Sequence, residues 1–235
     1  MDERLYRQEF EGSFESVGLG LAYHAFSRAE NVKACQYDAS KPLIWSLDFN
    51  VHPMCSVLLQ RAGDTVHALD EMALQNANTP AACEEFLQRT AAWRRYGTIA
   101  MEVYGDASGY QRRTSGSGTD WSLIREFFAG RKSEFQASIR GATANPGVRD
   151  RVNIVNSRLC SASGERNLFI DPRCRELVRD LERVQWKADR TERSRDELDK
   201  SDRMRTHVSD ALGYYLAQAF AMRGTIGPKL EGRLW

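Results

Sequence analysis

The sequence predicts an α/β fold with a mixed five-stranded sheet, in the order β-β-β-α-β-α-β, flanked by helices and followed by additional C-terminal helices. Three observations predict it. Residues 43–49 form a nearly continuous apolar run, which is typical of a central strand covered on both faces. The apolar period then lengthens to three or four residues over 79–96, as in a helix. Two later strand-like runs, 98–104 and 135–140, are each reached through a helical segment, which is the pattern of crossover connections.

Composition indicates an ordered protein with mixed charge. Of 235 residues, 42% are hydrophobic, which is enough for a core, and 33 basic residues stand against 32 acidic ones. A net charge of +1 neither favours nor excludes nucleic acid, so any basic surface must be local. The five cysteines form no Cys-x-x-Cys pair, which argues against structural zinc and for a reducing compartment. We find no signal peptide, no long apolar run and no nucleotide-binding Gly-x-x-x-x-Gly-Lys motif.

The strands are predicted before the helices. After the first strand, residues 54–61 and 65–74 are expected to pair as a hairpin around the turn 62–64, which completes a three-stranded meander. Residues 98–104 and 135–140 are the fourth and fifth strands, and 167–170 is a short extra strand.

Helix starts are predicted from caps and prolines. The dipeptides Thr79-Pro80, Asn145-Pro146 and Asp171-Pro172 each place a capping residue before a proline, and Asp120 is expected to cap a helix that stops at Gly130. The last helix begins near Thr206 and is apolar nearly all round. The charge-dense stretch 187–205 is interpreted as a solvated connector, and residues 1–40 as a polar lead-in.

This order of elements resembles the ribonuclease H-like superfamily, and three acids lie where its chemistry needs them. Asp48 is inside the first strand, Asp106 ends the fourth strand, which is the first strand's neighbour in that topology, and Asp210 is on the last helix. We expect the three carboxylates to converge on one site. Oxygen-rich clusters suit Mg²⁺ or Mn²⁺, and two such ions can activate water and stabilise the leaving oxygen in phosphodiester cleavage.

Each acid also has an ordinary structural interpretation. Asp210 on a buried helix can simply pair with an arginine, and Asp106 can be a turn aspartate. Possible auxiliary ligands are Asp202, Glu71 and His207; a strand end for Glu71 and a backbone-bonded histidine at a helix start are the alternatives.

Short motifs spread along the chain resemble the nuclease domain of the large terminase subunit of tailed bacteriophages. Each motif is weak alone, but their order and spacing are specific. They are residues 6–15, Ser46-Leu47-Asp48-Phe49-Asn50, Leu69-Asp70-Glu71-Met72, Gly105-Asp106-Ala107-Ser108-Gly109, Arg151-Val152-Asn153, Asp171-Pro172-Arg173-Cys174 and 206–214.

The resemblance implies a metal-dependent endonuclease that cuts concatemeric double-stranded viral DNA during genome packaging. It implies catalytic and metal-binding roles for Asp48, Asp106 and Asp210, a nuclease domain over 41–235, and a junction over 1–40 that follows an ATPase domain. The implied partners are that ATPase domain, a small terminase subunit and a portal protein, with no membrane. The implied location is the host cytoplasm, transiently at the procapsid portal. The sequence corresponds either to an excised domain or to a shorter relative.

Two other functions remain open at this stage: a junction resolvase-like nuclease of the same fold, and a catalytically silent module that docks on DNA or the portal. For DNA binding, we expect Arg112 and Arg113, in a glycine- and serine-rich loop after Asp106, to contact phosphates without reading bases. The alternative is that both arginines are merely solvated.

Overall fold

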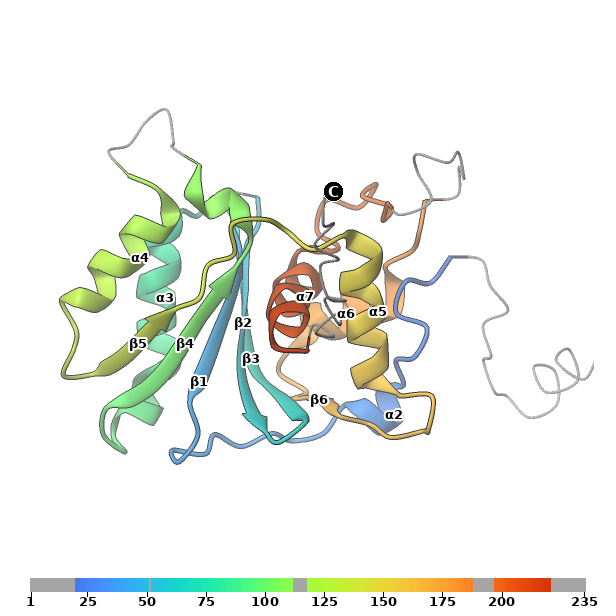
Figure 1. Ribbon diagram of the computed structural model, residues 1–235, viewed down its shortest axis with the longest axis horizontal. Coiled ribbons are helices and arrows are strands. Elements are labelled where there is room, and N and C mark those ends of the chain that lie inside the picture. The colour runs from blue at the N-terminus through green and yellow to red at the C-terminus, as the bar shows by residue number, and fades with distance from the viewer. Residues whose placement is uncertain (1–19, 51, 112–117, 188–196, 221–235) are drawn as a thin grey trace, which may run out of the picture.

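The sheet has the predicted order of strands and one strand more than predicted. The computed structural model describes residues 20–50, 52–111, 118–187 and 197–220 (Figure 1). Its sheet is six-stranded, in the order β5-β4-β1-β2-β3-β6. The strands are β1 (Leu43–Asp48), β2 (Met54–Ala62), β3 (Thr65–Leu74), β4 (Ile99–Gly105), β5 (Phe135–Ile139) and β6 (Leu168–Ile170).

The predicted meander and crossovers are confirmed. β1, β2 and β3 pair antiparallel, while β4 pairs parallel to β1 and β5 parallel to β4. The prediction of five strands in the sheet was wrong, because the short strand β6 joins its far edge, parallel to β3. Three residues carry little sequence signal for pairing, and the chain reaches this edge after the helix α5 (Val148–Leu159).

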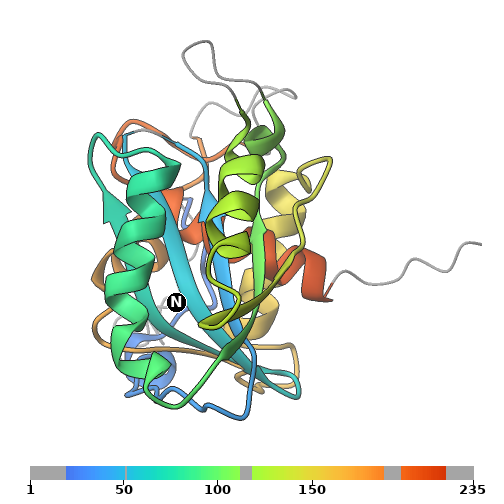
Figure 2. The ribbon, with the colours of Figure 1, turned by 90° about the vertical axis from the view of Figure 1, so that its left-hand side faces the viewer.

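Helices cover both faces of the sheet, so that the molecule has three layers (Figures 1 and 2). One face carries α3 and α4; the other carries α5, α6 and α7, with the four-residue α2 near β6. A separate apolar cluster fills each interface. The helices are α2 (Arg28–Asn31), α3 (Thr79–Arg94), α4 (Asp120–Ala129), α5 (Val148–Leu159), α6 (Arg175–Arg183) and α7 (His207–Phe220), with the 3₁₀ helix η1 (Ala107–Tyr110) after β4.

β1 is buried along its whole length, as its apolar run predicts. Its one hydroxyl, Ser46, donates to the carbonyl oxygen of Ala211 at 2.6 Å. Because a buried hydroxyl needs a partner, this bond ties the central strand to the middle of α7. It fixes α7 beside the end of β1.

The helix caps differ from the predictions by one to three residues. Asn78, not Thr79, caps α3 by accepting from the amide of Ala81, and Thr119, not Asp120, caps α4 in a capping box with Ser122. In both cases the residue one step earlier has the extended backbone that a cap requires.

The other two cap-and-proline pairs lie before their helices rather than in them: α5 begins at Val148 and α6 at Arg175. The Asp171 carboxylate accepts from the amides of Cys35 and Arg173, so it shapes the turn ahead of α6 instead of starting it. Among the described helices, none is both long and apolar enough to span a bilayer.

Candidate functional site

Asp48 and Asp106 lie side by side at the carboxyl ends of two neighbouring parallel strands. The pairing of Leu47 with Gly105 in the β1–β4 ladder places the next residue of each strand at the same edge of the sheet. The relative solvent exposure of Asp48 is only 3% and that of Asp106 only 7%. Burial, and then the nearby charge of Asp48, raises the pKa of Asp106 to about 6. Two buried carboxylates at neighbouring strand ends are a donor set that suits a hard cation.

The loop that carries Asp106 is held close to the sheet. The hydroxyl of Ser108 lies 2.9 Å from both carboxylate oxygens of Asp106. One residue on, a Cβ at Gly109 would lie 2.5 Å from the ring of Phe49 and 2.7 Å from that of Trp121. Only glycine allows η1 to pack this tightly, so the orientation of the Asp106 carboxylate is set by the turn itself.

Asp210 lies in the first turn of α7 and is paired with Arg151 from α5. The Nη2 of Arg151 lies 2.7 Å from Oδ1 of Asp210, and their side chains are only 7% and 6% exposed. Gly213 makes room for this pair, since a Cβ there would be 2.5 Å from Cγ of Arg151. Burial raises the pKa of Asp210, which Arg151 opposes and Asp48 reinforces. The structure therefore shows the arginine pairing that the sequence left open as an alternative.

His207 and Asn50 hold the Asp48 carboxylate. The Nδ1 of His207 lies 2.9 Å from Oδ2 of Asp48, and the Asn50 amide donates to the same oxygen at 2.5 Å. The other ring nitrogen, Nε2, lies 3.2 Å from the carbonyl oxygen of Arg203. The hydrogen bond to Asp48 raises the pKa of His207, because it stabilises the charged ring. His207 is therefore the backbone-bonded histidine at a helix start that was the alternative, and its role as an auxiliary metal ligand stays a prediction.

Tyr214 on α7 is influenced by the charges of all three carboxylates. Burial raises its pKa, and Asp48, Asp210 and Asp106 each raise it further. The guanidinium of Arg151 lies over its ring, 4.5 Å from the centroid. The phenol therefore lies in the combined electrostatic field of the three aspartates.

The residues around this region were not found from the sequence. Asn50, Arg151 and Tyr214 lie within motifs noted in the sequence, but they were given no role there, because only the tertiary fold brings them to the aspartates.

The region is not a preassembled metal centre. In the ranges that the structure describes, no three His, Cys, Asp or Glu side chains are grouped so that they could hold a metal ion. Arg151 engages Asp210, and His207 with Asn50 engages Asp48. The chemistry of the donors nevertheless fits a hard cation, since all three are carboxylates and Asp48 and Asp106 repel each other. The sharing of one metal site by the three acids stays a prediction.

The other two auxiliary candidates, Glu71 and Asp202, have different partners. Glu71 caps α6: its carboxylate accepts from the amides of Glu176 and Leu177 at 2.7 and 2.8 Å. Asp202 is 61% exposed and accepts from the amide of Met204. Arg112 and Arg113 lie outside the described residues.

A cavity of about 340 Å³ opens beside Asp210, and its walls carry the cations Arg151, Lys187 and Lys200. Lys187 forms an ion pair with Glu197. The charge of Lys200 lowers the pKa of Asp210 and that of His207. The charge density of 187–205 predicted a solvated connector. That prediction is wrong for the last part of the stretch, because Leu198 is buried and pairs with Trp186.

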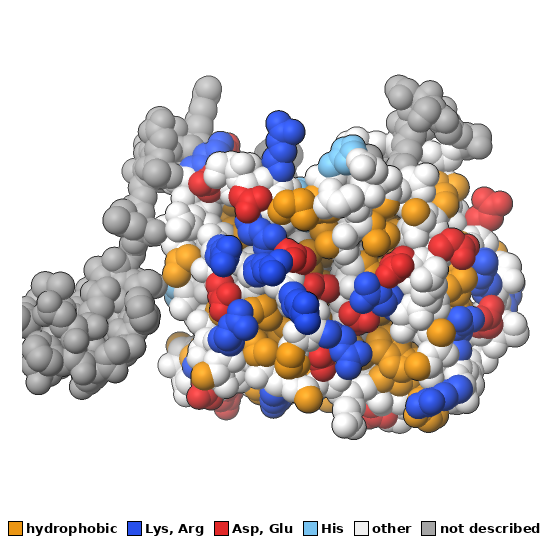
Figure 3. All heavy atoms as spheres, turned by 180° about the vertical axis from the view of Figure 1, so that it is seen from behind, with side chains coloured by type: hydrophobic (Ala, Val, Ile, Leu, Met, Phe, Trp, Pro, Cys, Tyr) orange, Lys and Arg blue, Asp and Glu red, His pale blue; other side chains and the backbone are white. Residues whose placement is uncertain are grey.

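The far end of the same stretch fixes α7. Arg205 lies 3.0 Å from the fully buried carboxylate of Asp180, whose other oxygen accepts from the amide of Ser209. Asp180 thus caps α7 at the amide of Ser209, the residue before Asp210. On the face seen in Figure 3, Lys and Arg side chains lie among Asp and Glu side chains.

No family model and no curated protein matches the sequence. Solved structures do match the fold. The large terminase of a thermophilic bacteriophage aligns at a TM-score of 0.58 and 15% identity over 85% of this chain, and this chain spans 45% of its length. The large terminase nuclease domain of P22 aligns at 0.55 and 15% identity, over 86% of this chain and 94% of that one.

A third match is the large terminase nuclease of the thermophilic phage G20c, solved with bound cobalt, at a TM-score of 0.50 and 9% identity over 87% of this chain and 98% of that one. The chain therefore shares the fold of these large-terminase nuclease structures, as its motifs and order of elements predicted.

Proposed function

We propose that this chain is the nuclease domain of a terminase large subunit, a metal-dependent endonuclease that cuts concatemeric double-stranded viral DNA during packaging. The observation that supports the proposal best is the position of Asp48 and Asp106 at the adjacent carboxyl ends of β1 and β4. Asp210 lies in the first turn of α7, and the charge of Asp48 raises its pKa. The fold shared with large-terminase nuclease domains supports the same conclusion. The cobalt-bound G20c nuclease supports the use of a divalent ion.

Asp48, Asp106 and Asp210 would hold two ions, Mg²⁺ or Mn²⁺. When bound, such ions supply an activated water and stabilise the leaving oxygen of the cut strand. The protein contributes placement. Ser108 fixes the Asp106 carboxylate, and Asn50 fixes that of Asp48. Arg151 pairs with Oδ1 of Asp210, which would leave Oδ2 available to a metal ion.

The substrate would reach the site through local cations rather than a broad basic face. Lys200 stands beside Asp210 in the 340 Å³ cavity, and Arg112 and Arg113 follow η1 in the sequence. Cations on either side of a carboxylate cluster can hold phosphates that would otherwise be repelled. As partners we propose the ATPase domain, the small subunit and the portal, and as location the host cytoplasm with transient binding at the procapsid portal.

The test is nicking of supercoiled plasmid with Mg²⁺, with Mn²⁺ and with EDTA. We expect nicking with either metal and none with EDTA. Asp48→Asn and Asp106→Asn should abolish it, since each removes a charged oxygen ligand. Asp64→Asn is the matched control, because that aspartate lies in the β2–β3 turn and its side chain is 76% exposed.

The other functions predict different outcomes. Absence of metal-dependent nicking, with retained DNA binding, would identify a silent docking module instead. A strong preference for branched over linear DNA would identify a junction resolvase-like nuclease.

A further inference from the structure

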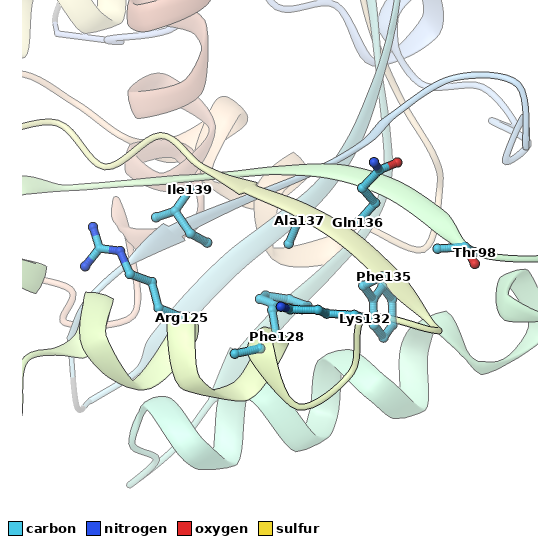
Figure 4. Close-up of a pocket in the computed structure, with 9 residues that line it drawn as sticks. Thr98, Arg125, Phe128, Lys132, Phe135, Gln136, Ala137 and Ile139 are labelled. Carbon is cyan, nitrogen blue, oxygen red and sulfur yellow. The ribbon is translucent and has the colours of Figure 1, made fainter.

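A second hollow lies on the opposite side of the sheet, between α4 and the edge strand β5. It has a volume of about 500 Å³ (Figure 4). Its walls are mostly apolar, and its charged members are Arg125 on α4 and Lys132 just after that helix. The other residues that matter for the argument are Phe128, Phe135, Ala137 and Ile139. A space of this size accommodates more than one apolar side chain.

The strand that borders this cavity has an open hydrogen-bonding edge. β5 ends the sheet, and no described strand pairs with its outer side. The backbone N–H and C=O groups of the even-numbered residues point toward β4. The carbonyl of Glu134 accepts from the amide of Ile99, and the amide of Arg140 donates to the carbonyl of Val103. Backbone groups alternate along a strand, so those of Ala137 and Ile139 face outward. An outer row of this kind is a template for another strand.

The cavity carries positive charge that the described protein does not neutralise. Arg125 and Lys132 form no ion pair with any described residue, although neighbouring cations do: Arg94 pairs with Glu134, and Arg131 lies 3.9 Å from Glu84. No carboxylate of the described residues lines the cavity. An incoming segment with acidic side chains would find two uncommitted partners there.

We propose that the outer edge of β5 docks an extended acidic segment of a partner protein, which adds a strand to the sheet. The segment's backbone pairs with Ala137 and Ile139, alternate apolar side chains enter the 500 Å³ cavity, and its carboxylates meet Arg125 and Lys132. This site is separate from the aspartates at the ends of β1 and β4 and does not depend on the proposed nuclease activity.

A peptide fits this surface better than DNA does. Phosphates could use Arg125 and Lys132, but a duplex offers neither a strand of amides for Ala137 nor apolar side chains for a cavity walled by Phe128 and Phe135. Strand addition uses the open edge and the apolar space together.

The probe is a short synthetic peptide with two aspartates at each end and alternating valine and threonine between them. Binding to the full chain is measured by fluorescence anisotropy and by amide NMR shifts. We expect shifts centred on Ala137 and Ile139. Lys132→Glu should weaken binding by about fivefold to tenfold, because an exposed attraction becomes a repulsion. Arg95→Glu, an exposed arginine at the end of α3, is the matched control.

A second variant tests the edge itself. Ala137→Pro removes one outward N–H without touching the bonds to β4, and should weaken binding by about fivefold. Should Ala137→Pro fail to fold, the same question is answered from the peptide side, because methylation of its alternate amides should abolish binding to the unaltered chain.

Three outcomes would overturn the proposal. The first is peptide affinity that Lys132→Glu and amide methylation both leave unchanged. The second is a DNA duplex that binds here, with Lys132→Glu weakening DNA and the peptide failing to compete. The third is a concentration-dependent dimer that Ala137→Pro dissolves, which would make a second copy of the chain the occupant.

Discussion

Replacing Arg151 by methionine tests how the buried aspartates are balanced. The change keeps an apolar stem of similar reach but removes the guanidinium 2.7 Å from Asp210. Asp210 would then be a buried carboxylate without its cation, close to Asp48. Breaking a buried ion pair from one side costs about 3–5 kcal/mol. For a domain of this size we expect Tm to fall by roughly 6–20 °C in the absence of metal, at about 2–4 °C per kcal/mol.

Divalent metal should reverse part of this loss. In the unaltered chain an ion competes with Arg151 for Asp210, whereas in Arg151→Met it meets a free carboxylate. A ligand at about a hundred times its dissociation constant adds about 2.7 kcal/mol of stability. The rise in Tm on adding millimolar Mn²⁺ should therefore be larger for Arg151→Met than for the unaltered chain.

The assay is thermal unfolding followed by circular dichroism, with and without Mn²⁺. Arg158→Met serves as control, because it lies on the same helix and contacts only the ring of Phe220 among its charged or aromatic partners in the described structure. It should cost no more than about 1 kcal/mol. If Arg151→Met and Arg158→Met lose the same stability, or if Mn²⁺ raises both proteins equally, Asp210 is not held by Arg151 in the way described.

The other predictions concern metal, pH and DNA. Millimolar Mg²⁺ or Mn²⁺ should raise the Tm of the unaltered chain but not of Asp48→Asn, because the cation relieves the repulsion between carboxylates; equal melts would count against a metal site. Burial raises the pKa of Glu71 from 4.5 to about 7, so the folded state holds a proton that the unfolded state releases, and stability should fall as pH rises between those values. Glu71→Gln should flatten that decline when the free energy of unfolding is measured by urea titration at several pH values. If the stability of Glu71→Gln falls with pH as steeply as that of the unaltered chain, Glu71 is not the source of the decline. The double change Arg112→Ala with Arg113→Ala should weaken DNA binding similarly on unrelated sequences and flatten its salt dependence, and Lys200→Ala should reduce the salt slope by about one; unchanged slopes would remove these residues from the DNA path.

The central part of the fold could be predicted because its signals are local. The apolar run of β1, the hairpin turn after β2 and the change of period at α3 each fall within one short segment. Asp48 stood out for the same reason, since a buried strand seldom carries a carboxylate. Placing β4 beside β1 then brought Asp106 to the same edge without any knowledge of side-chain contacts.

The partners of those acids could not be predicted, because they depend on pairing between distant segments. Arg151 and Asp210 are 59 residues apart, and nothing in the sequence distinguishes that arginine from the others. Glu71 likewise has a carboxylate that could bind a metal ion. In the structure that carboxylate accepts hydrogen bonds from two amides at the start of α6, 105 and 106 residues later. Charge density misled at 197–205, where Leu198 and Arg205 are held by contacts with Trp186 and Asp180.

The two ends of the sheet differ in a way that bears on self-association. Beyond β6, Val32 bridges to Ile170 and the amide of Lys33 donates to the Ile170 carbonyl, so that border is already occupied. The β5 border is open, and two copies meeting there about a twofold axis would bring the cations Arg125 and Lys132 of both copies together. The repulsion between these cations would oppose such an association at low ionic strength. It would weaken as added salt shortens the Debye length. Storage buffers rich in salt would remove the protection that the protein supplies for itself.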